Sequence, residues 1–132
     1  MFINHQILVQ AKGEPTYHFK NGSLADGLAV PVVGSTSFSV ARRFTDSTEL
    51  VSEKMLAIAM LRLIEMEQLV VEGGGAAALA AILPGGPLYG KFEGKNVILP
   101  LCGGNVDTTT LGRVIDRYAY TLGLFVLHVL NF

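Results

Sequence analysis

The sequence contains one cysteine, no tryptophan and few charged side chains. Because Cys102 is alone, an intrachain disulfide is excluded, and no grouping of cysteine and histidine has the spacing of a metal site. His5, His18 and His128 stand far apart along the chain. A single cysteine without a partner predicts a reduced, cytoplasmic protein.

Charge of either sign is scarce and nearly balanced. Lys and Arg number 10 against 11 Asp and Glu, which gives a formal net charge of −1. The longest basic cluster is the pair Arg42 and Arg43, which is typical of a solvated helix edge. This balance gives no electrostatic reason to expect a nucleic acid or an anionic membrane as a partner.

Segments that target a chain to a membrane are also missing. Residues 1–6 lack the positive start and the long apolar stretch of a signal peptide. The apolar tail, residues 118–132, is shorter than the roughly 20 residues that cross a bilayer. The sequence therefore predicts no membrane association.

The length of 132 residues suits one domain with a single core. Apolar residues make up 50% of the chain and charged residues 16%, so the composition favours burial. Such a composition is typical of part of a larger α/β enzyme, or of a chain that covers apolar surface with a partner.

Four short segments have the composition of β-strands: residues 16–19, 49–51, 69–71 and 96–101. The last is an almost continuous apolar run, which predicts a strand buried on both faces of a sheet. Helical patterns alternate with these segments, so we predict an α/β fold with a partial, mostly parallel sheet and flanking helices. Ligands of such sheets bind at the carboxyl ends of the strands.

The strongest helical pattern covers residues 53–68. Ser52 is a good N-cap, Glu53 suits the first turn, and apolar residues recur at helical spacing through Ile64. The methionines of this stretch, Met55, Met60 and Met66, are predicted to fill the core.

Three further helices are predicted with less regular patterns. Residues 36–44 form a short helix with Phe38, Ala41 and Phe44 inward, and residues 76–83 form a helix of small residues. Asp107 or a following threonine begins the last helix, which runs through Ile115.

The glycine turn after the third predicted strand permits two interpretations. Gly73-Gly74-Gly75-Ala76-Ala77-Ala78 satisfies the dinucleotide pattern G-x-G-x-x-A, in which a pyrophosphate binds at a helix N-terminus. The next strand, however, ends in Cys102 rather than in an acid that would hold a ribose. The alternative is that the glycines let a helix pack closely on its neighbour.

The turn after the fourth predicted strand is Cys102-Gly103-Gly104-Asn105-Val106-Asp107. Cys102 is interpreted as a core thiol, as a nucleophile, or as a neutral hydrogen-bonding group facing a flat cofactor. A nucleophile needs a neighbouring base, and no histidine is placed by the sequence to supply one.

Three ordered motifs together resemble a known family. Ala25-Asp26-Gly27, the stretch from Glu72 to Ala81, and the stretch from Cys102 to Asp107 look like the C-terminal half of the pyridoxal-phosphate (PLP) dependent threonine ammonia-lyases. Serine/threonine dehydratases and serine racemases share the pattern more loosely. The resemblance implies the fold-type II, tryptophan synthase β-like PLP fold, and deamination of L-threonine or L-serine to a 2-oxo acid and ammonia.

Carried over by position, the resemblance implies a cofactor-binding wall. Cys102 would face the pyridine nitrogen of PLP, and the backbone of Gly27 would lie against the cofactor. Glu72 would lie near the ring, and Gly103, Gly104 and Asn105 would form the adjacent wall.

The family's lysine that binds PLP covalently, and its loop that grips the cofactor phosphate, precede the matched region. The lysines of this chain, none in the family's Ser-Phe-Lys context, are Lys12, Lys20, Lys54, Lys91 and Lys95. The resemblance therefore implies that this chain alone neither anchors PLP nor catalyses the reaction, and we assign no catalytic residue and no metal ligand.

The chain is divided into three parts by the same resemblance. Residues 1–10 diverge from the family, residues 11–117 match the C-terminal portion of its catalytic domain, and residues 118–132 form a divergent apolar tail. The tail is interpreted either as a buried helix or as the product of altered splicing or of a truncated gene model.

Three classes of function follow. The first is a PLP-dependent lyase fragment, inactive alone, whose parent enzyme acts on an amino acid as a threonine/serine dehydratase or as a serine racemase. The second is a non-catalytic regulatory or partner fragment that associates with itself or with a full-length homologue. The third is a small dinucleotide-binding module that uses Gly73 to Ala78.

Overall fold

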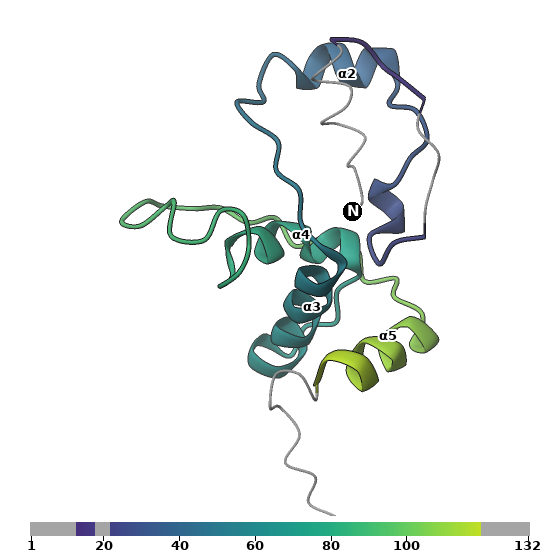
Figure 1. Cartoon of the computed structure of the whole chain (residues 1–132), viewed down its shortest axis with the longest axis vertical. Coiled ribbons are helices and arrows are strands. Elements are labelled where there is room, and N and C mark those ends of the chain that lie inside the picture. The colour runs from purple at the N-terminus through teal and green to yellow at the C-terminus, as the bar shows by residue number, and fades with distance from the viewer. Residues whose placement is uncertain (1–12, 18–21, 120–132) are drawn as a thin grey trace, which may run out of the picture.

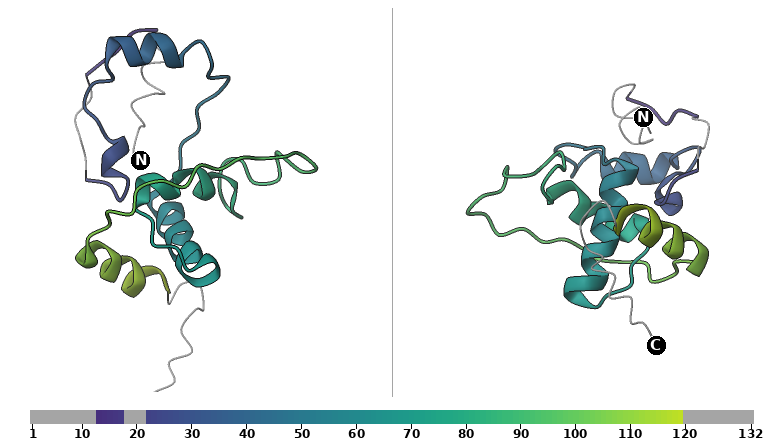
Figure 2. Two further views of the ribbon diagram at one scale, coloured as in Figure 1. Left: turned by 180° about the vertical axis from the view of Figure 1, so that it is seen from behind. Right: turned by 60° about the horizontal axis from the view of Figure 1, so that its bottom comes forward.

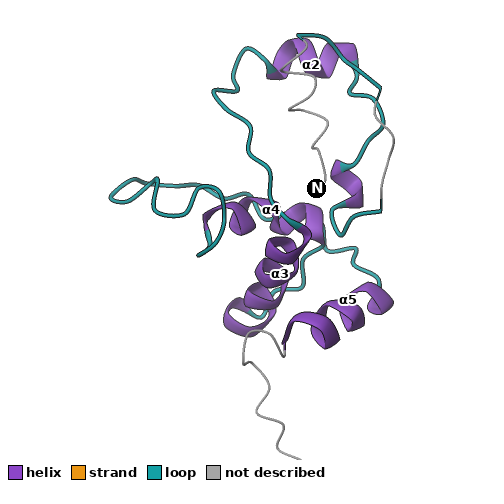
Figure 3. Ribbon diagram, in the orientation of Figure 1, coloured by secondary structure: helices purple, strands orange, loops and turns teal. Residues whose placement is uncertain are grey.

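The computed structural model describes residues 13–17 and 22–119, and Figure 1 shows their path. Within these ranges every regular element is helical (Figure 3): the 3₁₀ turn η1 (Asp26–Leu28), α2 (Ser35–Ala41), α3 (Glu53–Glu67), α4 (Gly73–Ile82), α5 (Thr108–Val114) and the π-helical turn η2 (Ile115–Ala119). None of these described helices is long and apolar enough to cross a membrane.

Helix α3 forms where the sequence predicts it. Ser52 is its N-cap, and the Ser52 hydroxyl accepts a hydrogen bond of 3.2 Å from the Met55 N–H. The helix ends at Glu67, and its C-cap residue Gln68 adopts the left-handed conformation with φ of 58°. The predicted N-cap is confirmed, and the helix ends one residue before its predicted end.

Ser52→Ala removes this cap and leaves the first-turn N–H of Met55 without its acceptor. We expect the free energy of unfolding to fall by about 1 kcal/mol. Urea denaturation followed by far-UV circular dichroism measures the change. Ser47→Ala is the matched control, because Ser47 is exposed and lies outside every helix; equal losses in the two variants would contradict the capping role.

The core lies where α3 packs on α4. Four alanines at this contact are fully buried and allow the close approach: Ala57, Ala59, Ala76 and Ala80. Met60 of α3 and Val114 of α5 fill the remaining space, and both are only 1% exposed. Figures 1 and 2 show α5 beside α3, so three helices close around one small core.

Helix α5 begins at an aspartate cap, Asp107, which is one of the two starts that the sequence predicts. The Asp107 carboxylate accepts a hydrogen bond of 2.7 Å from the Thr110 N–H. Hydrogen bonds from the side chain and then from the backbone of Thr110 lower the pKa of Asp107 from its ordinary value of 3.8.

This lowered pKa predicts a pH dependence of stability. A carboxylate with a depressed folded-state pKa stabilises the fold above its unfolded value, and the effect is lost as pH falls through the folded pKa. Asp107→Asn keeps an N-cap that does not titrate. We expect the stability difference between the wild type and Asp107→Asn to stay constant above about pH 5 and to shrink below the ordinary pKa of 3.8. Urea titrations at several pH values measure it; a difference that does not vary with pH would contradict the prediction.

The sequence prediction fails mainly at the strands. Within the described residues, 49–51, 69–71 and 96–101 form no strand, and the 16–19 segment lies partly outside the described ranges. Ile98, expected inside a sheet, is 92% exposed. A strand needs a neighbouring strand to accept and donate its backbone hydrogen bonds. Among the described residues, the backbone bond that these segments make runs instead from the Leu69 N–H to the Leu63 carbonyl oxygen, at 3.0 Å, and closes the end of α3.

Three smaller predictions are also wrong. Helix α2 lies at the far end of a long loop, away from α3, α4 and α5 (Figure 1), so Ala41 is exposed and Phe44 is 81% exposed. Met66 is 69% exposed at the end of α3, whereas Met55 and Met60 are buried as predicted. Helix α4 begins at Gly73, three residues before its predicted start. Residues 1–10 and most of the 118–132 tail lie outside the described ranges.

Candidate functional site

The two glycine turns singled out in the sequence meet in space. The Glu72 N–H donates a hydrogen bond of 2.8 Å to the Gly103 carbonyl oxygen, and this bond joins the segment before α4 to the segment before α5. A Cβ atom added at Gly75 would overlap the Cys102 carbonyl oxygen and would come within 2.7 Å of Val71 Cγ1. The absence of a side chain at Gly75 is therefore what lets the turns approach.

The N-terminus of α4 also packs against the start of the Ala25-Asp26-Gly27 segment. A Cβ atom at Gly73 would overlap the Leu24 carbonyl oxygen. Because Gly73 and Gly75 are both buried against backbone, close packing is the role that the structure gives to these glycines, in preference to the dinucleotide pattern.

Glu72 lies between two glycines that the sequence placed at the site. A Cβ atom at Gly27 would be 3.9 Å from Glu72 Oε1, and one at Gly103 would be 2.6 Å from Glu72 Cγ. Gly103 also has φ of +79°, which a residue with a side chain rarely adopts. The half-buried Glu72 side chain thus fills space that side chains at these two positions would take.

The remaining predicted site residues lie on the exposed side of this junction. Cys102 is a free, exposed cysteine whose backbone packs on Gly75, so the core-thiol interpretation is wrong. An added Cβ atom at Gly104 would meet open space, and Asn105 is exposed at the rim of a cavity. Three of the six predicted residues, Gly27, Glu72 and Gly103, are brought into one cluster.

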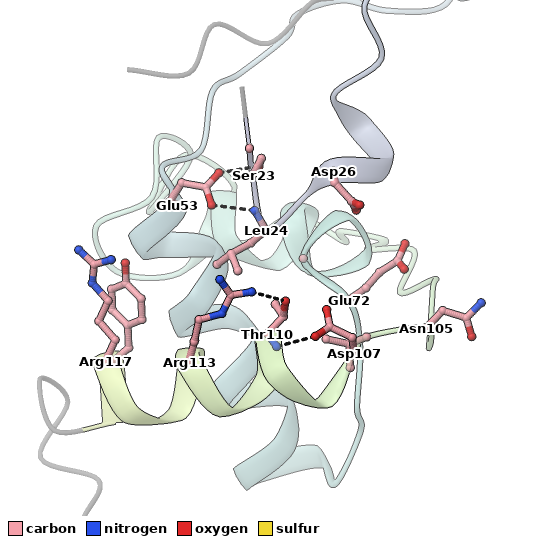
Figure 4. A pocket seen from close by; sticks show the side chains of 14 residues that line it. Ser23, Leu24, Asp26, Glu53, Glu72, Asn105, Asp107, Thr110, Arg113 and Arg117 are labelled. Atoms are coloured by element: carbon pink, nitrogen blue, oxygen red, sulfur yellow. Dashed lines mark hydrogen bonds between the residues drawn. The ribbon is translucent and has the colours of Figure 1, made fainter. Parts of the chain in front are cut away.

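A cavity of about 680 Å³ adjoins this cluster, and Figure 4 shows it between η1, α3, α4 and α5. Its lining includes four carboxylates and two guanidiniums: Asp26, Glu53, Glu72, Asp107, Arg113 and Arg117. Arg113 donates a hydrogen bond of 3.1 Å to the Thr110 hydroxyl. A cavity of this size with both signs of charge suits a small polar molecule.

Sequence reasoning missed the residues on the opposite wall of the cavity. The Ser23 hydroxyl donates to Glu53 Oε1 at 2.6 Å, and the Leu24 N–H donates to Glu53 Oε2 at 2.8 Å. From the sequence, Glu53 is predicted only to be an acid in the first turn of a helix. Its contact with Ser23 joins residues 30 apart in sequence, and no local pattern signals such a pair.

The described part of the chain has few side chains that could bind a metal ion or attach a cofactor through an amine. No three His, Cys, Asp or Glu side chains there lie close enough together to hold a metal ion. The three lysines of the described ranges, Lys54, Lys91 and Lys95, are exposed and do not line the cavity; Lys12 and Lys20 lie outside those ranges. Within the described residues, therefore, no lysine amine lines the cavity beside the cluster.

Comparison with known proteins identifies the family. The family model described as "Pyridoxal-phosphate dependent enzyme" matches residues 4–103. The chain belongs to this family. The resemblance to threonine ammonia-lyases seen in the sequence is thereby confirmed, and PLP is the cofactor of the family.

Relatives within the PLP-dependent family are amino-acid enzymes. The chain is 39% identical over 102 residues to the catabolic L-threonine dehydratase of Staphylococcus aureus, covering 77% of this chain and 30% of that protein. It is 38% identical over 104 residues to the L-threonine ammonia-lyase of Geobacter sulfurreducens, covering 79% of this chain and 25% of that protein. The chain thus spans less than a third of the length of each.

Solved structures agree with this relationship. Serine racemase from Dictyostelium discoideum matches with a TM-score of 0.67 and 31% identity, covering 79% of this chain and 32% of that one. Threonine deaminase isoform 2 from Solanum lycopersicum matches in fold with a TM-score of 0.75 and 24% identity, covering 85% of this chain and 31% of that one. The described helices therefore have the arrangement found in part of an α/β PLP-dependent enzyme.

The residues present fit the PLP cofactor only in part. The space left by the glycines at 27 and 103 is taken up by the Glu72 side chain, while Cys102 is a free, exposed thiol. No described lysine reaches the cluster or the cavity. We therefore derive no chemical step through the cofactor in this chain.

Proposed function

We propose that residues 11–117 are the C-terminal portion of the catalytic domain of a PLP-dependent lyase that deaminates L-threonine or L-serine to a 2-oxo acid and ammonia. The junction of Glu72 and Gly103 carries this proposal, because it joins two of the three motifs on which the resemblance rests. Similarity to a threonine dehydratase and to a threonine ammonia-lyase supports the substrate class.

In this proposal the cluster is one wall of the cofactor site. Cys102 faces the pyridine nitrogen, Gly27 lies against the cofactor, Glu72 lies near the ring, and Gly103, Gly104 and Asn105 complete the wall. The cofactor supplies the chemistry, and the protein supplies placement and a hydrogen-bonding environment. Cys102 is exposed in the chain as described, so its thiol is accessible to such a contact.

The predicted parallel sheet belongs to the same proposal. Residues 69–71 and 96–101 pair as strands when the remainder of the catalytic fold supplies their neighbours. The bond from the Glu72 N–H to the Gly103 carbonyl oxygen lies directly after both segments, and in this proposal the pairing starts at this end. A free cysteine is compatible with the cytoplasmic location that we propose.

The chain alone is proposed to be inactive. Purified protein incubated with PLP and L-threonine is expected to form no 2-oxobutanoate above a protein-free control, and L-serine is expected to yield neither pyruvate nor D-serine. The full-length Staphylococcus aureus dehydratase serves as the positive control. Robust deamination would overturn the inactivity, and accumulation of D-serine would assign racemisation instead.

A second candidate function is that of a non-catalytic partner of a full-length relative. The uncovered apolar side chains of residues 96–101 favour it: Val97, Ile98 and Leu101 are all exposed. Large exposed apolar surface marks interaction sites in soluble proteins. Stable co-purification with an intact threonine dehydratase would support this function, and separate elution at micromolar concentrations would exclude it.

A further inference from the structure

Glu53 makes a set of contacts that the helix N-terminus does not require. Both of its carboxylate oxygens are used, one by the Ser23 hydroxyl at 2.6 Å and the other by the Leu24 N–H at 2.8 Å. The Ser23 oxygen in turn accepts a hydrogen bond of 3.0 Å from the Ala25 N–H. We call this set of bonds the Ser23–Glu53 clasp. All three bonds are partly buried, where charge-assisted bonds are stronger than on an open surface.

The clasp closes the base of a long loop. Residues 26–52 leave the core at η1, carry α2 outward and return at the start of α3 (Figures 1 and 2). Helix α2 makes no substantial contact with any other described element. The path of residues 23–27 is therefore fixed by contacts at the base of the loop, where the clasp lies, and not by contacts of α2 at its far end.

Residues 23–27 lead directly to the candidate site. The Leu24 carbonyl lies against Gly73, Ala25 is buried in the core, and Gly27 lies beside the Glu72 carboxylate. A shift of Leu24 would consequently move Gly27 with respect to Glu72. Figure 4 shows Glu53, Ser23 and Leu24 together on one wall of the cavity, with Glu72 across it.

We infer that Glu53 is a positioning residue: through Ser23 and Leu24 it sets the place of Gly27 beside Glu72 in the wall proposed for the cofactor. The role of Glu53 in cofactor binding rests on the proposed function. The position of Gly27 relative to Glu72, however, can be measured in the chain without cofactor. The carboxylate is suited to this role because two donors, a hydroxyl and a backbone N–H, converge on it and need two acceptor oxygens.

Two substitutions break the clasp in different ways. Glu53→Gln removes the charge and replaces one acceptor oxygen by a donor, so the Ser23 hydroxyl and the Leu24 N–H no longer each have an oxygen of their own. Ser23→Ala leaves Glu53 and its charge at the start of α3 in place and removes only the hydroxyl. Ser23→Thr keeps the hydroxyl and is the conservative variant. Glu65→Gln, on the exposed side of the same helix, is the control for loss of a charge.

The test is amide hydrogen exchange and ¹H–¹⁵N NMR on the full chain without cofactor. For Glu53→Gln and Ser23→Ala we expect exchange of the Leu24 and Ala25 amides to accelerate at least tenfold and the Gly27 and Gly103 signals to shift. Protection within α3, at Met60 and Leu63, is expected to stay unchanged. Ser23→Thr and Glu65→Gln are expected to match the wild type.

Two results would overturn the inference. In one, the Gly27 and Gly103 signals keep their positions although the Leu24 amide exchanges freely. In the other, α3 loses protection together with Leu24, which would mean that the clasp only stabilises the fold. If Glu53→Gln does not fold, the comparison of Ser23→Ala with Ser23→Thr decides whether the clasp positions Gly27. Because no readout depends on PLP or on turnover, failure of the proposed lyase function would leave this result intact.

Discussion

Replacing Gly75 with alanine is expected to destabilise the chain by about 3 kcal/mol, at the upper end of the range for overpacked cores. The added methyl group would overlap the Cys102 carbonyl oxygen and would press on Val71. Neither the backbone at Cys102 nor the buried Val71 can move without disturbing the bond from Glu72 to Gly103. Urea denaturation measures the loss, and hydrogen exchange of the Glu72 amide reports whether the junction opens.

Gly74→Ala is the matched control one residue away in the same helix. Its methyl group would lie 3.5 Å from Leu28 Cγ, an ordinary van der Waals distance. Alanine also has the higher helix propensity, by up to about 1 kcal/mol in a helix interior. We expect this variant to be as stable as the wild type or slightly more so. Equal destabilisation of the two variants would contradict the close approach of the glycine turns.

Met60→Ala is expected to lower the free energy of unfolding by about 3 kcal/mol, because it removes a fully buried side chain and leaves a cavity between α3 and α4. Met60 is 1% exposed, and it packs where three helices meet. Met66→Ala makes the same chemical change in the same helix at a residue that is 69% exposed.

For Met66→Ala we expect a change within about 0.5 kcal/mol, as for surface substitutions in general. Denaturation curves of the two variants in parallel provide the measurement. A loss at Met66 comparable to that at Met60 would show that the end of α3 is covered, in contradiction to the exposed position described above.

Some features could be predicted from the sequence because their causes are local. Ser52 and Asp107 cap helices through their own neighbours, and the apolar spacing of α3 selects its buried face. The rule that ligands bind at the carboxyl ends of strands singled out both glycine turns as a candidate site. The structure brings Glu72 and Gly103 of these turns together, although no strand forms within the described residues.

Other features depend on partners that the sequence of this chain does not reveal. Residues 96–101 have the composition of a buried strand, but burial requires a neighbour on each side, and Ile98 has none among the described residues. Phe44 was expected to face a core that lies far from α2 (Figure 1). The Ser23–Glu53 clasp joins distant residues of ordinary types, so only the folded chain shows it.

The proposal that this chain has no lysine that anchors PLP covalently is tested most directly by mass spectrometry. The chain is incubated with PLP, reduced with borohydride, digested, and examined for a cofactor adduct on each of its lysines, with the full-length Staphylococcus aureus dehydratase as the positive control. We predict no stoichiometric adduct at any one lysine of this chain and a single labelled lysine in the dehydratase. Stoichiometric labelling of one lysine here, suppressed by L-threonine, would contradict the proposal that this chain holds only one wall of the cofactor site.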